Sequence, residues 1–185
     1  MSLRPSLSSI KLQKLRDFFG CQDQSLIKEL KESFRDAASE SIHADGDRQI
    51  ELLINEGTAP FKDKPENETL QIIMYLLAER PACERKECEA IFWEEFCGAA
   101  SANMITVSKR SAPLLSQLVR GRPLLGNKIE TTWSFYSWLD KDEASLMFQE
   151  ILAHKDAQKM FDFEDARDWM QGVVKNKQDV WFFAS

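Results

Sequence analysis

The sequence predicts an α+β fold: a helix-rich single globular domain over residues 1–185, packed on a small sheet that includes the C-terminal strand. Three observations lead to this prediction. The chain has 185 residues with 43% hydrophobic and 29% charged side chains, which is ordinary for a globular protein and long enough to bury a core. Apolar residues recur at helical spacing through most of the chain. Two segments, 131–139 and 179–184, are instead rich in aromatic residues and have the pattern of strands.

The N-terminal segment predicts a strand followed by two helices. Residues 3–9 are a candidate opening strand, and residues 10–19 have the apolar spacing of a short helix. Asp23 is the predicted N-cap of the next helix, which should end by about Ser41. The apolar stripe of that helix consists of Leu26, Ile27, Leu30, Phe34 and Ala37.

A turn and two further helices are predicted next. Residues 44–47 contain a glycine between two aspartates, which is typical of a turn, and a third helix should run from residue 47 to residue 55. Residues 67–79 are apolar nearly all round, which favours a central buried helix. A buried strand is the alternative for this segment, because periodicity alone does not separate the two.

The middle of the chain predicts two more helices. The first spans residues 84–96, with Cys88 on its apolar face, and Gly98 should end it. Residues 99–109 are expected to be irregular. Pro113 in the first turn favours a short helix from Ser111 to about residue 118.

The last third of the chain predicts two strands separated by two capped helices. Residues 131–139 show the two-residue alternation of a strand. Asp140 is the predicted N-cap of the following helix, with Glu143 completing a capping box, and Asp162 is the predicted N-cap of the last helix. The terminal run 179–185 would aggregate as an exposed edge, so we expect a central strand, flanked by 131–139 and by the N-terminal segment.

Charge and hydropathy exclude two classes of partner. The formal net charge is −6 and no stretch is rich in lysine or arginine, so we expect no nucleic-acid binding. The longest apolar run, Ile72 to Ala78, is far shorter than a membrane span, so we expect no membrane insertion. The N-terminal residues have no apolar run of the kind found in secretory signals, which predicts a cytoplasmic location with reduced thiols.

Four cysteines, Cys21, Cys83, Cys88 and Cys97, leave three interpretations open. They form no Cys-x-x-Cys pair and have no histidine nearby in sequence, whereas tetrahedral zinc needs close ligand pairs and four donors. Ordinary core or surface thiols are therefore favoured over a zinc site or a nucleophile.

His43, Asp45 and Asp47 are the candidate metal ligands. A turn could gather these three side chains around a divalent cation, but aspartate and glycine are also ordinary turn and capping residues. The only other histidine, His154, falls at the predicted C-terminal end of a helix, where a cation is stabilised by the helix dipole. No complete ligand set and no phosphate-binding loop is visible, so we predict no bound metal and no other cofactor.

The aromatic residues of the predicted sheet have two interpretations. In the first, helices cover them and they form the core. In the second, Trp133, Tyr136 and Trp138 form a surface that binds a partner, because tryptophan and tyrosine are enriched among interface hot spots.

Several segments together resemble a known family. They are residues 9–20 with the helix at 24–34, residues 138–144 (WLDKDEA), and the helix at 163–174 that runs into 180–185 (VWFFAS). In this order they resemble the YfbM-like group of small bacterial domains, over less than half of the chain. The resemblance implies an α+β fold and a bacterial source, and it carries over no catalytic residues.

Two classes of function remain open at this stage. The first is a non-enzymatic soluble binding protein that acts through a protein partner, as immunity and regulatory proteins do; the acidic charge and the many aromatic residues favour it. The alternative is an enzyme whose site is assembled from distant residues, with His43, Asp45, Asp47 and Cys83 as the first candidates.

Overall fold

A computed structural model describes residues 5–80, 87–88, 90–102, 104–130 and 135–184. The chain divides into two compact units. The first consists of residues 1–10, 84–122 and 135–185, and the second of residues 11–83 and 123–134. The fold is α+β and helix-rich, as predicted, while the single domain expected over 1–185 stays a prediction.

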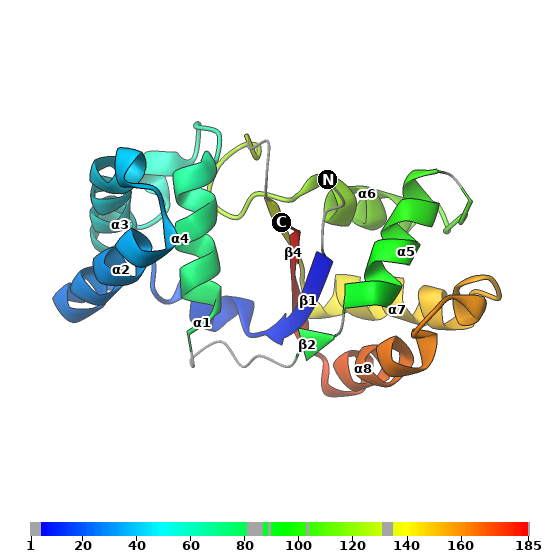
Figure 1. Ribbon diagram of the computed structural model, residues 1–185. Helices are drawn as coiled ribbons and strands as arrows, with labels where there is room; N and C mark the ends of the chain where they lie inside the picture. The colour runs from blue at the N-terminus through cyan, green and yellow to red at the C-terminus, as the bar shows by residue number, and fades with distance from the viewer. Residues whose placement is uncertain (1–4, 81–86, 89, 103, 131–134, 185) are drawn as a thin grey trace. The chain divides into compact units, whose positions relative to one another are not determined.

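The first unit contains the sheet (Figure 1). Its strands are β1 (Pro5–Ile10), β2 (Glu87–Cys88), β3 (Phe135–Leu139) and β4 (Asp179–Ala184), in the spatial order β2-β1-β4-β3. All pairings are antiparallel. The aromatic C-terminal strand therefore lies between β1 and β3, which confirms its predicted central position. Its backbone groups are paired on both sides, which removes the edge that would otherwise aggregate.

One face of this sheet packs against the helices α5 (Ala90–Ser101), α6 (Ala112–Arg120), α7 (Lys141–Ala153) and α8 (Phe163–Asn176). Figure 1 shows these four helices grouped on one side of β1 and β4. The strand residues that contribute to the shared core are Leu7, Leu139, Val180 and Phe182. In the helical layer the ring centroid of Phe92 lies 5.1 Å from that of Trp93 and 5.7 Å from that of Phe163. The two-residue period of the strands thus places one apolar set on the helix-covered face.

The second unit is helical in its described part. Its helices are α1 (Leu12–Arg16), α2 (Gln24–Ala37), α3 (His43–Glu56) and α4 (Glu68–Ala78), with short 3₁₀ turns η1 (Glu40–Ile42) and η2 (Ala59–Phe61). The helix favoured for residues 67–79 is confirmed as α4, so the strand alternative is wrong. Four residues of the predicted stripe of α2 are buried, from Leu26 to Phe34, which confirms the face assigned to it, but Ala37 at the end of the helix is exposed, contrary to the prediction.

The turn predicted at residues 44–47 is wrong, because α3 begins at His43 and includes them. The change of direction after α2 takes place earlier, in η1. Gly46 is buried inside α3, where a Cβ would lie 2.2 Å from Cε1 of Phe34. The glycine is therefore required by the close packing of α3 against α2 and not by a turn.

The helix predicted at residues 84–96 begins later and ends later than expected. Cys88 belongs to β2, where it pairs with Leu7 of β1, and α5 runs from Ala90 to Ser101 with Gly98 inside it. The pairing with β1 overrides the helical spacing of the local sequence, which is a tertiary effect. A Cβ at Gly98 would meet nothing within 4 Å, and the helix continues past this residue to Ser101.

The predicted helix caps are confirmed where a side chain can accept backbone hydrogen bonds. Asp23 accepts from the N–H groups of Ser25 and Leu26 at the start of α2. Asp140 and Glu143 form the predicted capping box of α7. Asp162 does precede α8, but its φ of 53° is left-handed and its side chain makes no capping hydrogen bond.

Candidate functional site

The three candidate metal ligands lie in the first two turns of α3, and each has a partner of its own. Nε2 of His43 donates to the carbonyl oxygen of Ala38 (3.1 Å). Asp45 accepts from the amide of Gln49 (2.6 Å). Successive positions in a helix are separated by about 100°, so residues two apart in sequence point in nearly opposite directions. Asp45 therefore points away from the side of α3 that carries His43.

Asp47 also has a partner outside the predicted set, since its Oδ2 accepts from the guanidinium of Arg35 (2.6 Å). Over the described residues, no group of three or more histidine, cysteine, aspartate or glutamate side chains is placed to hold a metal ion. Cys83, the fourth candidate of the enzyme alternative, lies outside the described residues. The structure therefore does not bring these candidates together, and the enzyme alternative gains no support from them.

The predicted interaction surface was Trp133, Tyr136 and Trp138. Tyr136 is fully buried and stacks on Trp181, with ring centroids 4.4 Å apart. Trp138 is half-buried beneath the guanidinium of Arg122, which lies 3.7 Å from its ring centroid. Trp133 lies outside the described residues. Tyr136 thus offers no exposed area to a partner, and a surface built from these three residues stays a prediction.

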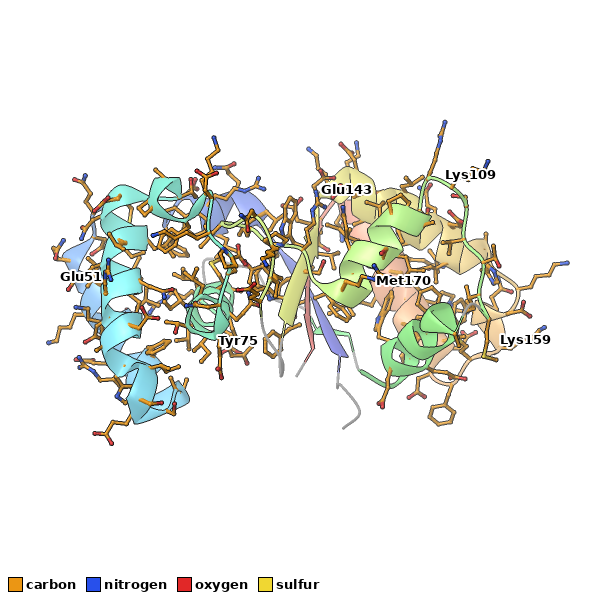
Figure 2. The ribbon with its side chains drawn as sticks, turned by 90° about the horizontal axis from the view of Figure 1, so that it is seen from above. Glu51, Tyr75, Lys109, Glu143, Lys159 and Met170 are labelled. Atoms are coloured by element: carbon orange, nitrogen blue, oxygen red, sulfur yellow. The ribbon has the colours of Figure 1, made fainter. Side chains whose placement is uncertain are left out.

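Arg122 lies over the ring of Trp138, and its charge is already compensated. Its Nη1 donates to Oε2 of Glu143 (2.6 Å) and to the carbonyl oxygen of Trp138 (3.3 Å). Glu143 lies at the start of α7, as Figure 2 shows. Arg122 therefore ties the end of β3 to α7, and a paired guanidinium of this kind is a poor site for an added anion.

A buried carboxylate that sequence reasoning missed lies in the second unit. Glu66 is fully buried, and its Oε1 accepts from the backbone N–H groups of Leu125 and of Gly126 (2.8 Å). Its Oε2 accepts from the amide of Gln71 (3.2 Å). A carboxylate with these partners ties the loop at 123–130 to the start of α4. This role is structural, because the hydrogen bonds occupy both oxygens.

A second carboxylate that sequence reasoning missed lies on α7. Glu150 accepts from the N–H and the hydroxyl of Ser108, the latter at 2.7 Å, and from the hydroxyl of Ser111. Burial raises the pKa of Glu150, but the hydrogen bonds from Ser111 and Ser108 and the charge of His154 outweigh burial, so its pKa lies below the ordinary 4.5.

Serine, histidine and glutamate occur together here, but they are not hydrogen-bonded in the sequence serine to histidine to carboxylate that catalysis needs. A serine nucleophile is activated by a base that accepts its proton, with the carboxylate orienting that base. Here both serines donate directly to Glu150. The arrangement fastens the start of α6 to α7 and does not form an activated nucleophile.

Phe161 is an exposed aromatic residue in the described part of the chain. Its exposure was not predicted from the sequence. It lies in the loop before α8, and its side chain is 66% exposed. Its backbone N–H donates to Oε2 of Glu95 on α5 (2.9 Å). An apolar residue directly before an N-cap usually packs against the fourth helical residue, here Ala166. Sequence reasoning of that kind would have buried Phe161.

Met104 is a second exposed apolar residue beside α5. Its side chain is 75% exposed, and its backbone N–H donates to the carbonyl oxygen of Ala99 in α5 (2.8 Å). Glu95 and Ala99 are one helical turn apart. The backbone of Phe161 is therefore bonded to the middle of α5 and that of Met104 to its C-terminal end, while both residues are exposed.

None of the helices in the described residues has the length and apolar content needed to cross a membrane. Comparisons with protein-family models, with curated proteins and with solved structures found no match to this chain. The resemblance to the YfbM-like group therefore stays a prediction.

Proposed function

We propose that the protein is a non-enzymatic binding protein that acts through a protein partner, as an immunity or regulatory protein does. The observation that carries the proposal is the exposure of Phe161 on a loop whose backbone is fixed to α5. Burying a Phe side chain that was exposed contributes about 1.5–3 kcal/mol, so this ring is a source of binding free energy.

The local structure favours binding over accidental exposure. Aromatic residues held in place lose little conformational entropy when a partner covers them, which is why they dominate interface hot spots. Asp162, directly after Phe161, adopts a left-handed φ of 53° without a capping hydrogen bond. Such a conformation is sparsely populated by residues with a Cβ, although aspartate adopts it more readily than most, and conformations of this kind occur at functional sites.

Met104 supports the same conclusion. Methionine is flexible and polarisable, so it adapts to the shape of a partner surface. Single exposed apolar residues are normal on a protein surface, but Phe161 and Met104 are both large and both have a backbone N–H bonded to α5.

We place this function in the cytoplasm. Cys21 is a free and exposed thiol, which a reducing compartment preserves.

The test is affinity capture from a lysate of the source cells, followed by mass spectrometry, with the wild-type chain and two variants compared. Phe161→Ala removes the exposed ring. Leu146→Ala is the matched control, because Leu146 is also an exposed apolar residue of the first unit (37%) but lies on α7. We expect a stoichiometric partner that binds wild type and Leu146→Ala and binds Phe161→Ala about 30-fold more weakly, the effect of a typical hot spot. A chain that captures no stoichiometric partner would refute the proposal.

A further inference from the structure

We infer that the partner is a basic protein that covers Phe161 with an apolar pocket ringed by lysine or arginine side chains. The inference rests on the proposed function and adds the chemistry of the partner. Its basis is the charge that surrounds Phe161 in the first unit.

The segment from Phe161 to Asp168 is acidic. It contains four carboxylates, at Asp162, Glu164, Asp165 and Asp168, against a single arginine. That arginine, Arg167, is paired with both Glu164 and Asp168. Asp165 is exposed in the first turn of α8, and Asp162 is half-buried at its start. The side of Phe161 that faces α8 therefore has an excess of negative charge.

The helix α5, to which the Phe161 backbone is bonded, adds to this charge. Glu94 and Glu95 are exposed on α5, and the carboxylate of Glu95 is the group that holds the Phe161 backbone. The basic residues in the preceding loop are Lys155 and Lys159. Lys159 is paired with Asp156 (2.8 Å) and points away from the helices in Figure 2. Over residues 155–168 together with 94–95 there are seven carboxylates and three basic groups, a net charge of 3 − 7 = −4.

This charge decides between classes of partner. Nucleic acid and anionic membrane surfaces are both negative, so they would be repelled from Phe161. A second copy of the chain is also disfavoured, because a two-fold interface centred on Phe161 would place like-charged rims opposite each other. A basic protein surface is attracted to the acidic rim while its apolar centre covers the Phe161 ring. This is the usual arrangement of an interface, with an apolar core and a polar rim.

The experiment replaces Phe161 by the photo-reactive residue p-benzoylphenylalanine, irradiates a lysate of the source cells, and identifies the crosslinked protein. The identified protein is then purified, and its dissociation constant is measured at low and high salt. Two double variants with equal change in net charge are compared: Glu94→Gln with Asp165→Asn, and the control Glu32→Gln with Asp36→Asn. The control residues are exposed on α2, in the second unit.

We expect a basic partner whose affinity for the Glu94/Asp165 variant is about fivefold lower than for the control at low salt, with the difference lost at about 0.5 M salt. A crosslink to a second copy of this chain would overturn the inference. So would a partner whose affinity responds equally to the two double variants, although the proposed function would then stand. The lack of any crosslinked partner would remove the proposed function and this inference together.

Discussion

Replacing Gly46 by alanine sets two opposing effects against each other in α3. In the interior of a helix, alanine is favoured over glycine by about 1 kcal/mol, because glycine loses more backbone entropy on folding. Helix propensity alone therefore predicts that Gly46→Ala stabilises the protein. The packing of α3 against α2 predicts the opposite sign.

The steric effect follows from the geometry around Phe34. A Cβ on residue 46 would lie 2.2 Å from Cε1 of that ring and 2.6 Å from both Cδ1 and Cζ. Carbon atoms in contact are about 3.5–4.0 Å apart, so one group must move by more than about 1 Å. Phe34 is fully buried and has the ring of His43 at 6.4 Å, which restricts its movement. Overpacking of this kind costs about 1–3 kcal/mol.

We expect Gly46→Ala to lower the free energy of unfolding by up to about 2 kcal/mol, the overpacking cost of about 1–3 kcal/mol less the gain of about 1 kcal/mol in helix propensity. The assay is urea unfolding followed by far-UV circular dichroism, which reports on helices of both units. Gly172→Ala in α8 is the matched control, because a Cβ at that position meets nothing within 4 Å. This control should raise stability by about 0.5–1 kcal/mol. If Gly46→Ala stabilised the protein as much as Gly172→Ala does, the packing argument would be refuted.

Three further predictions follow from the described contacts. Glu66→Ala leaves the buried N–H of Leu125, the partly buried N–H of Gly126 and the amide of Gln71 without their acceptor, so urea unfolding should show a free energy of unfolding lower by about 3–5 kcal/mol. A decrease below about 1 kcal/mol would contradict the structural role assigned to Glu66. Lys177 ends α8 with a left-handed φ of 50°, so Lys177→Gly should stabilise the protein by about 0.5 kcal/mol, seen as a higher Tm, and a lower Tm would contradict it. The pKa of Glu150 is lower in the folded protein than the ordinary 4.5, so its contribution is present above that value and is lost as pH falls through the lowered pKa. Unfolding between pH 6 and 3 should therefore be less pH-dependent in Glu150→Gln than in wild type, and equal slopes would show that this group does not contribute.

The elements that the sequence predicted correctly depend on local interactions. Asp23 caps α2 with hydrogen bonds to residues two and three positions ahead, and Asp140 and Glu143 act in the same way at α7. A cap of this kind involves only neighbouring residues, so its pattern is visible in the sequence. The central position of the C-terminal strand was predictable for a different reason, because its aromatic residues would be unstable on an exposed edge.

The errors occurred where contacts between distant residues override local preference. Gly46 lies between two aspartates, as turn glycines do, yet its role is to let Phe34 approach α3. Cys88 lies at helical spacing from later apolar residues, yet it pairs with Leu7, which is far away in the sequence. Local composition contains no information about either partner.

The candidate sites show the same division. The sequence by itself determined the α+β class, most of the helices, the helix caps and the acidic charge, because composition, periodicity and local hydrogen bonds are properties of neighbouring residues. Only the tertiary structure decided that Tyr136 is buried and that Phe161 is exposed. The exposure of a side chain depends on which distant helix packs beside it, and for Phe161 that helix is α5, through the hydrogen bond to Glu95.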